Sequence, residues 1–158
     1  MSEADAQAQI SRFTQANRFL KLTTPLGASR LLAESVRAEE GLSQGFALHI
    51  AALSTDAAIP LKSLIGQPLL LELLIVGSGG PRPFHGYVTK AELSGANGGF
   101  ARYRLVAEPW TAFLAHTRDS RIFQDMTVLD ILDAVFVRYH GQGKLVPSWR
   151  FDLRERAV

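Results

Sequence analysis

Short runs of alternating apolar and polar residues dominate the first two thirds of the chain. In residues 46–51, Phe46, Leu48 and Ile50 alternate with smaller or polar residues, which predicts a strand with one buried face. Residues 100–108 repeat this alternation, with Arg102 and Arg104 on the outer side. Further strands are predicted at residues 19–22, 31–39, 69–76 and 84–93.

The loops between these runs indicate how the strands connect. Residues 77–81 and 95–99 are rich in glycine, and each of these segments joins two predicted strands directly. Such loops are typical of antiparallel meanders and barrels, whereas parallel sheets need crossover helices. We therefore expect a mainly β protein with one or two helices (α+β), built as an antiparallel barrel or a strongly curved sheet.

Three structural features are predicted within residues 54–76. Residues 57–64 predict a short helical turn, capped by the polar residues 54–56 and limited in length by Pro60. The run 69–76 is apolar at almost every position, which predicts a strand covered on both faces. Glu72 interrupts this run, and a carboxylate there is expected to pair with an arginine.

The apolar spacing changes after Pro109 and predicts helices. The pattern predicts a short helix at residues 110–116, an extended segment at residues 120–124 and the start of another strand at residues 149–153. A longer helix is predicted over residues 127–139, capped by Thr127 with Asp130 at the third helical position, and packed against the sheet. Its apolar face is expected to be buried through Ile131, Leu132, Val135 and Phe136.

Composition narrows the class of protein. The 158 residues are 47% hydrophobic, which is enough to form a hydrophobic core. The chain contains no cysteine, so disulfide scaffolds and thiolate metal sites are excluded. The net charge of +2 and the scattered arginines form no basic stripe for nucleic acid. Residues 1–17 are polar, predicted to be a flexible N-terminus, and contain no signal peptide. The longest apolar run is too short for a membrane anchor.

A search for reaction chemistry assigns no catalytic, cofactor-binding or metal-binding residue, and leaves the binding residues unknown. The loop at residues 77–80 lacks the lysine of a phosphate-binding loop. The aspartates between residues 119 and 133 lack the glycine and glutamate of a calcium loop. Four histidines lie far apart without metal-ligand spacing: His49, His85, His116 and His140. We therefore expect a protein that is not an enzyme and has no cofactor.

Two other classes of function stay open at this point. An oligonucleotide-binding β-barrel needs aromatic and basic residues on one strand face, and the candidates are Phe100, Arg102, Tyr103 and Arg104. Tyr103, however, alternates to the face opposite the two arginines. A hydrolase could also bring catalytic residues together from several strands.

Several motifs resemble the N-terminal, phage baseplate-hub-like region of VgrG, the spike protein of bacterial type VI secretion. An Ile122-Phe123-Gln124 triplet ahead of Val128-Leu129-Asp130-Ile131-Leu132 is the most specific. The matches span roughly residues 18–140, and Gly45 stands where the family often has proline. The others are Glu39-Glu40-Gly41-Leu42-Ser43, Leu53-Ser54-Thr55-Asp56, Leu64-Ile65-Gly66, Phe84-His85-Gly86-Tyr87-Val88 and Pro109-Trp110.

The resemblance implies a structural part of a contractile injection machine. It implies a hub-like β-barrel domain at residues 18–147 and a further segment starting at residues 148–158, in a chain that is a fragment of a longer protein. A VgrG-like protein forms a homotrimer, caps the tube built from Hcp-like protein, and carries effector or adaptor proteins. It assembles in the bacterial cytoplasm and leaves through the secretion apparatus without a signal peptide.

Overall fold

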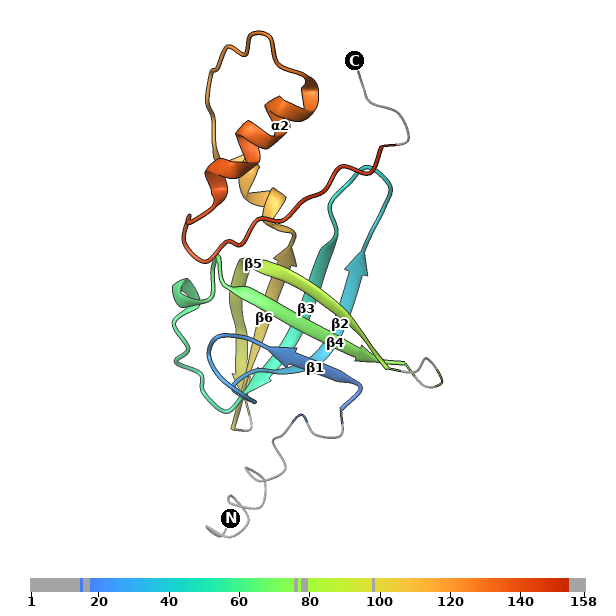
Figure 1. Ribbon diagram of the computed structural model, residues 1–158. Helices are drawn as coiled ribbons and strands as arrows, with labels where there is room; N and C mark the ends of the chain where they lie inside the picture. Colours follow the sequence, from blue (N-terminus) through green and yellow to red (C-terminus); the bar gives the residue numbers. More distant parts are fainter. Residues whose placement is uncertain (1–14, 16–17, 76, 78–79, 98, 154–158) are drawn as a thin grey trace.

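The computed structural model describes residues 15, 18–75, 77, 80–97 and 99–153. Its centre is one six-stranded sheet in which every neighbouring pair of strands is antiparallel (Figure 1). The strand order is β1-β4-β5-β6-β3-β2. The strands are β1 (Leu20–Thr23), β2 (Leu32–Glu39), β3 (Ala47–Ser54), β4 (Pro68–Leu74), β5 (Pro81–Asn97) and β6 (Phe100–Glu108).

The sheet curls strongly into a half-barrel because β5 belongs to both of its walls. The first part of β5 pairs with β4 and the second part with β6. The register shifts between Val88 and Lys90, and a bulge of this kind bends a strand. The curl brings the edge strands β1 and β2 into contact, where the Arg18 guanidinium donates a hydrogen bond to the Ala33 carbonyl (3.1 Å). The expected antiparallel, strongly curved fold is confirmed.

The concave side of the sheet holds the core. Alternate residues of β3 and β6 point inward and are fully buried, whereas Arg102 and Arg104 on β6 are exposed, as the alternation predicts. Tyr103 is completely buried, and its hydroxyl donates a hydrogen bond to the Asp56 carbonyl (2.8 Å). The core residues are Leu22, Leu31, Ala33, Leu48, Ile50, Ala52, Ile59, Leu64, Leu69, Leu71, Val88, Ala101, Tyr103, Leu105 and Ala107.

The expectation that β4 is covered on both faces is wrong. Leu69 and Leu71 are fully buried, but Leu70 and Glu72 on the other face are only half-buried. Glu72 lies opposite Lys21 of β1, and no ion pair of Glu72 occurs within the described part of the chain. The expected arginine partner is therefore absent there. A half-exposed carboxylate beside a four-residue edge strand stays solvated and does not require a buried partner.

The short helical segments follow the expected positions. η1 (Leu61–Ser63) is a single 3₁₀ turn after Pro60. The polar residues before it do not cap this helix, because they form a separate turn in which the Asp56 carboxylate accepts a hydrogen bond from the Ala58 amide (2.7 Å). η2 (Trp110–His116) is also a 3₁₀ helix. α2 (Val128–Phe136) continues into η3 (Val137–Tyr139), and Thr127 and Asp130 form the expected capping box.

The position of α2 differs from the expectation. The helix and its connections form a lobe at residues 110–153 that lies beyond one end of the sheet (Figure 1). No residue of α2 is fully buried, and Val128 remains 64% exposed. The apolar face of α2 was expected to be buried, and this expectation is wrong in degree. The residues of that face are only half-buried: Ile131, Leu132, Val135 and Phe136.

An aromatic cluster, rather than the sheet, holds the lobe together. Trp110 packs against Phe136, Tyr139 and Trp149, with ring centroids 5.1 to 6.1 Å apart, and Tyr87 of β5 joins the cluster to the sheet. Residues 120–124 have no regular secondary structure, and the strand expected at residues 149–153 does not form. Trp149 instead packs on the lobe, where its indole donates a hydrogen bond to Asp133 (2.5 Å).

Some expectations concern residues that the structure does not describe. The predicted flexible N-terminus falls on residues 1–17, of which only residue 15 is described. Residues 154–158 of the proposed further segment also lie outside the described residues. No described helix is long and apolar enough to cross a membrane.

Candidate assembly surfaces

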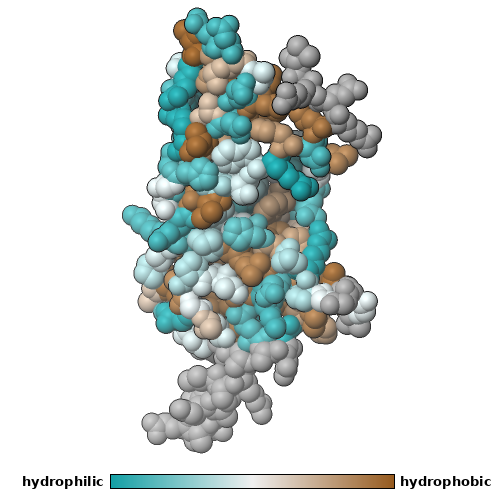
Figure 2. Space-filling model, in the orientation of Figure 1, coloured by the Kyte–Doolittle hydropathy of each residue, from teal (hydrophilic) through white to brown (hydrophobic). Residues whose placement is uncertain are grey.

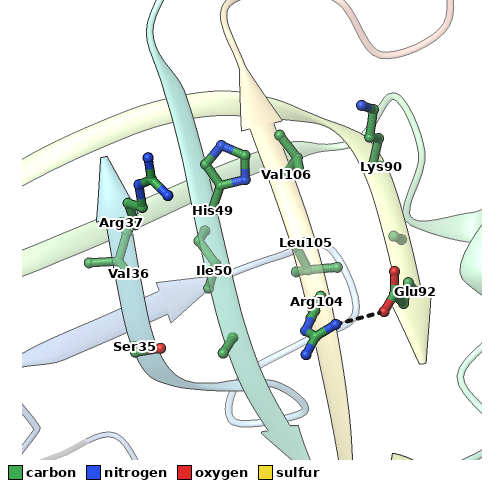
Figure 3. A pocket seen from close by; sticks show the side chains of 12 residues that line it. Ser35, Val36, Arg37, His49, Ile50, Lys90, Glu92, Arg104, Leu105 and Val106 are labelled. Atoms are coloured by element: carbon green, nitrogen blue, oxygen red, sulfur yellow. Dashed lines mark hydrogen bonds and ion pairs between the residues drawn. The ribbon is translucent and has the colours of Figure 1, made fainter. Parts of the chain in front are cut away.

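The outer face of the half-barrel carries a groove across four strands. The antiparallel register places Arg37 of β2, His49 of β3, Val106 of β6 and Lys90 of β5 in one row, and Figure 3 shows these side chains next to one another. The groove has a volume of about 350 Å³. A second row runs beside the first and consists of Ser35, Ala51, Arg104 and Glu92.

Positive charge prevails along this groove. Its lining includes three Arg or Lys side chains and a single carboxylate. That carboxylate, Glu92, accepts a hydrogen bond from Arg104 (3.2 Å; Figure 3). The Arg37 guanidinium lies 2.9 Å from the Glu39 carboxylate at the rim of the groove. Lys90 is exposed and forms no ion pair within the described part of the chain. The groove thus offers an available ammonium group beside small apolar side chains such as Ala51.

The lobe presents a second surface with different chemistry. Residues 122–137 contain three aspartates and no lysine, arginine or histidine. Several large apolar side chains on the same segment are exposed, and Ile122 is exposed to 89%. Figure 2 shows brown apolar groups between hydrophilic ones over the upper part of the molecule, which is the lobe in Figure 1. The exposed apolar and acidic residues of this segment include Ile122, Asp125, Met126, Val128, Asp130 and Val137.

Ion pairs and the helix cap hold this lobe surface in place. Asp119 bonds both Arg121 and Arg138, each at 2.7 Å, and so ties the connection before α2 to the turn after it. Hydrogen bonds from these two arginines lower the pKa of Asp119 to about 2. The Thr127 hydroxyl and backbone N–H lower the pKa of Asp130. Both carboxylates therefore remain charged at neutral pH.

The structure places the residues considered for other functions apart from one another. Tyr103 is fully buried, so it offers no aromatic platform for a nucleic-acid base beside Arg102 and Arg104. The groove holds a single carboxylate, so it contains no pair of carboxylates for hydrolysis. Within the described residues, no group of three or more His, Asp or Glu side chains is arranged to hold a metal ion.

Comparison with known proteins identifies the family. Residues 39–156 match the family described as the phage tail baseplate hub (GPD). The chain belongs to this phage tail baseplate hub family. It is a homologue of VgrG, being 36% identical over 124 residues to the type VI secretion system spike protein VgrG1c of Pseudomonas aeruginosa, and 36% identical over 122 residues to VgrG1b of the same organism. These matches cover 78% and 77% of this chain but 17% and 16% of the relatives.

A solved structure shares the hub fold. An Escherichia coli protein aligns with a TM-score of 0.64 and 26% identity, covering 77% of this chain and 33% of that protein. It is described as a component of the type VI secretion system with structural similarity to the T4 bacteriophage tail proteins gp27 and gp5. The resemblance seen in the sequence motifs is thereby confirmed. The names of the family and of these relatives describe a phage tail baseplate hub and spike proteins of type VI secretion.

Sequence reasoning assigned no binding residues and missed both surfaces. The outward positions of each strand were readable from alternation. Their assembly into one groove depends on the order β5-β6-β3-β2, which alternation does not reveal. The sequence did contain a signal for the lobe surface. Residues 122–137 include acidic residues, which are usually exposed, and more apolar residues than a small lobe can bury.

Proposed function

We propose that this chain is the hub part of a type VI secretion spike and acts as a structural adaptor rather than an enzyme. In this role three copies form a ring that caps the Hcp tube and helps to deliver effector or adaptor proteins. The observation that carries the proposal is the 36% identity to spike proteins over 78% of the chain. The chain spans about 17% of that relative's length, so the functions of a whole spike extend beyond the compared region.

The physical character of the described residues supports an assembly role. The lobe keeps large apolar side chains in water, including Ile122 at 89% and Val128 at 64% exposure. Large apolar side chains exposed on a folded surface are often found at protein–protein contact sites. The groove adds fixed charges that give such contacts orientation and specificity. An adaptor requires surfaces of this kind and does not require a catalytic pocket.

The proposal includes the route of the protein. The chain assembles in the bacterial cytoplasm and leaves with the spike through the secretion apparatus. The relatives that support this route are named as spike proteins of the type VI secretion system. The division into a hub-like domain at residues 18–147 and a following segment at residues 148–158 is part of the same proposal.

The experiment is a test of tube capping. The purified full chain carries a gold label at an N-terminal tag, and it is mixed with assembled tubes of Hcp for electron microscopy. We expect label at tube ends, displaced by an excess of unlabelled chain. Light scattering on the chain alone is expected to give a mass near three times 17.3 kDa at high concentration. Label spread along the tube walls, or no label, contradicts the capping role.

A further inference from the structure

We propose that the groove on the outer face of β2, β3, β6 and β5 binds a short acidic peptide segment of another protein. The segment lies across the four strands, with one carboxylate at Lys90, a second carboxylate at Arg37 and an aliphatic side chain on Val106 between them. This assignment goes beyond tube capping, because it concerns the chemistry of a partner that a single copy of the chain binds on its own sheet face.

The shape of the groove follows from the sizes of four side chains on two neighbouring strands. β3 and β6 place His49 opposite Val106, and Ala51 opposite Arg104. The two small side chains, Val106 and Ala51, are therefore diagonal neighbours on one face of the sheet, about 7 Å apart. Because the longer His49 and Arg104 side chains occupy the other diagonal, the surface is hollowed at this point of the 350 Å³ groove (Figure 3). The hollow has an apolar base that accepts an aliphatic side chain.

The available positive charge lies at the two ends of the first row. Lys90 is exposed and forms no ion pair within the part of the chain that the structure describes. Arg37, at the opposite end, contacts Glu39 through one nitrogen, and its other N–H groups remain for a second carboxylate. Glu39 weakens the attraction at that end, so Lys90 is the stronger contact. In the second row Arg104 and Glu92 already pair with each other at 3.2 Å, which favours acidic residues along the first row only.

The spacing of the strands sets the spacing of the two carboxylates. Lys90 and Arg37 lie on strands that are three strand spacings apart, which is about 14 Å. An extended peptide advances about 3.4 Å per residue, so four residues cover this distance. The acidic residues therefore stand at positions i and i+4. The residue at i+2 points to the same side of the peptide and lies over the middle of the row, beside Val106.

An acidic peptide fits this groove better than a nucleic acid or a polyphosphate does. A polyanion needs several free cations, and single-stranded nucleic acids also stack on aromatic side chains. Arg37 and Arg104 each contact a carboxylate already, and the described lining residues include no Phe, Tyr or Trp. Closely spaced phosphates would also meet Glu92 in the second row. The groove therefore favours a ligand whose single charges are separated by an aliphatic group.

The test is an NMR titration of the isotope-labelled full chain with the peptide acetyl-Asp-Ser-Val-Ser-Asp-amide. We expect amide shifts centred on Lys90, Ala51 and Val106. Lys90→Glu replaces an attraction by a repulsion and should raise the dissociation constant about tenfold or more. Lys62→Glu, at an exposed position outside the groove, is the matched control and should bind like the unchanged chain. Both positions are exposed, so amide spectra away from the substitutions should match that of the unchanged chain.

Two matched peptides separate the charged part of the contact from the apolar part. Asparagine in place of both aspartates keeps the size and removes the charges, which should weaken binding about tenfold. Serine in place of valine removes the aliphatic group, which should weaken binding about fivefold. Binding of the original peptide should also weaken between about 0.05 M and about 0.5 M salt, because salt screens exposed charges.

The inference is overturned if about 10 mM peptide shifts no amide of the groove, if Lys90→Glu binds the peptide unchanged, or if the asparagine peptide binds equally well. It is also overturned if inorganic phosphate or a single-stranded oligonucleotide, at equal ionic strength, shifts the same amides and displaces the peptide, since the groove is then a general anion site. The tube-end label tests the proposed function separately. A chain that binds the peptide at the groove but labels no tube ends supports the inference and contradicts the capping role.

Discussion

The aromatic cluster joins the lobe to the sheet. Its contribution to the stability of the lobe can be measured by replacing one side chain, Phe136. Phe136 packs edge-to-face on Trp110 at 5.1 Å and on Trp149 at 5.3 Å between ring centroids. Replacement by alanine removes two aromatic pairs, worth about 1 kcal/mol each. It also removes the burial of half of an aromatic side chain, worth about 1 kcal/mol more. We therefore expect Phe136→Ala to lower the free energy of unfolding of the lobe by about 3 kcal/mol.

The two tryptophans of the chain provide a local probe, because both Trp110 and Trp149 belong to this cluster. Urea unfolding followed by tryptophan fluorescence therefore reports on the lobe, and circular dichroism of the strands reports on the sheet. With a typical urea dependence, the fluorescence midpoint of Phe136→Ala should fall by about 1–2 M. If the two signals shift together, lobe and sheet unfold as one cooperative unit.

Val128→Ala is the matched control for this prediction. Val128 belongs to the same helix but is 64% exposed, so its replacement should change the free energy of unfolding by less than about 0.5 kcal/mol. A loss below about 1 kcal/mol for Phe136→Ala would refute the reasoning, because it would mean that the ring contacts do not hold the lobe. Equal losses for the two variants would refute it as well.

Three further predictions follow from single hydrogen bonds and ion pairs. Tyr103→Phe should cost about 1–2 kcal/mol in urea unfolding, because the Asp56 carbonyl loses a buried donor; an unchanged stability contradicts that role. Thr127→Ala should cost about 0.5–2 kcal/mol by loss of the helix cap, with rescue by Thr127→Asp and none by Thr127→Val. Asp119 has a folded pKa near 2 against an ordinary 3.8, so its contribution is present above pH 4 and is lost as the pH falls toward 2. A carboxyl titration by NMR that places the pKa of Asp119 near 3.8 would contradict the double arginine contact.

Local chemistry made the strands and caps predictable. The period-two alternation of β3 and β6 depends on neighbours along the chain, since successive side chains of a strand must point to opposite faces. The capping box of Thr127 and Asp130 spans four consecutive residues, so the sequence contains it completely. The motifs shared with VgrG likewise depend on residue order alone, and the family match confirmed them.

Long-range packing decided the features on which prediction failed. The apolar face of α2 has the period of a buried helix, but the amount of protein available to cover it is set by the placement of the lobe beyond the sheet. The alternation at residues 149–153 fits a strand, yet Trp149 packs on Trp110 and bonds Asp133. A strand requires a partner edge, and the alternation of a single segment does not reveal whether such an edge lies within reach.

The sequence by itself determined the β-rich class, the strands, the helix with its cap and the relationship to hub proteins, because each of these depends on local periodicity or residue order. Only the tertiary structure decided the candidate assembly surfaces. The groove exists because the sheet places Lys90 of β5, Val106 of β6 and His49 of β3 in one row, although these residues are separated by up to 57 positions in the chain. The acidic lobe surface exists because packing leaves one face of α2 in solvent. Both depend on which distant segments meet, and that information belongs to the folded chain as a whole.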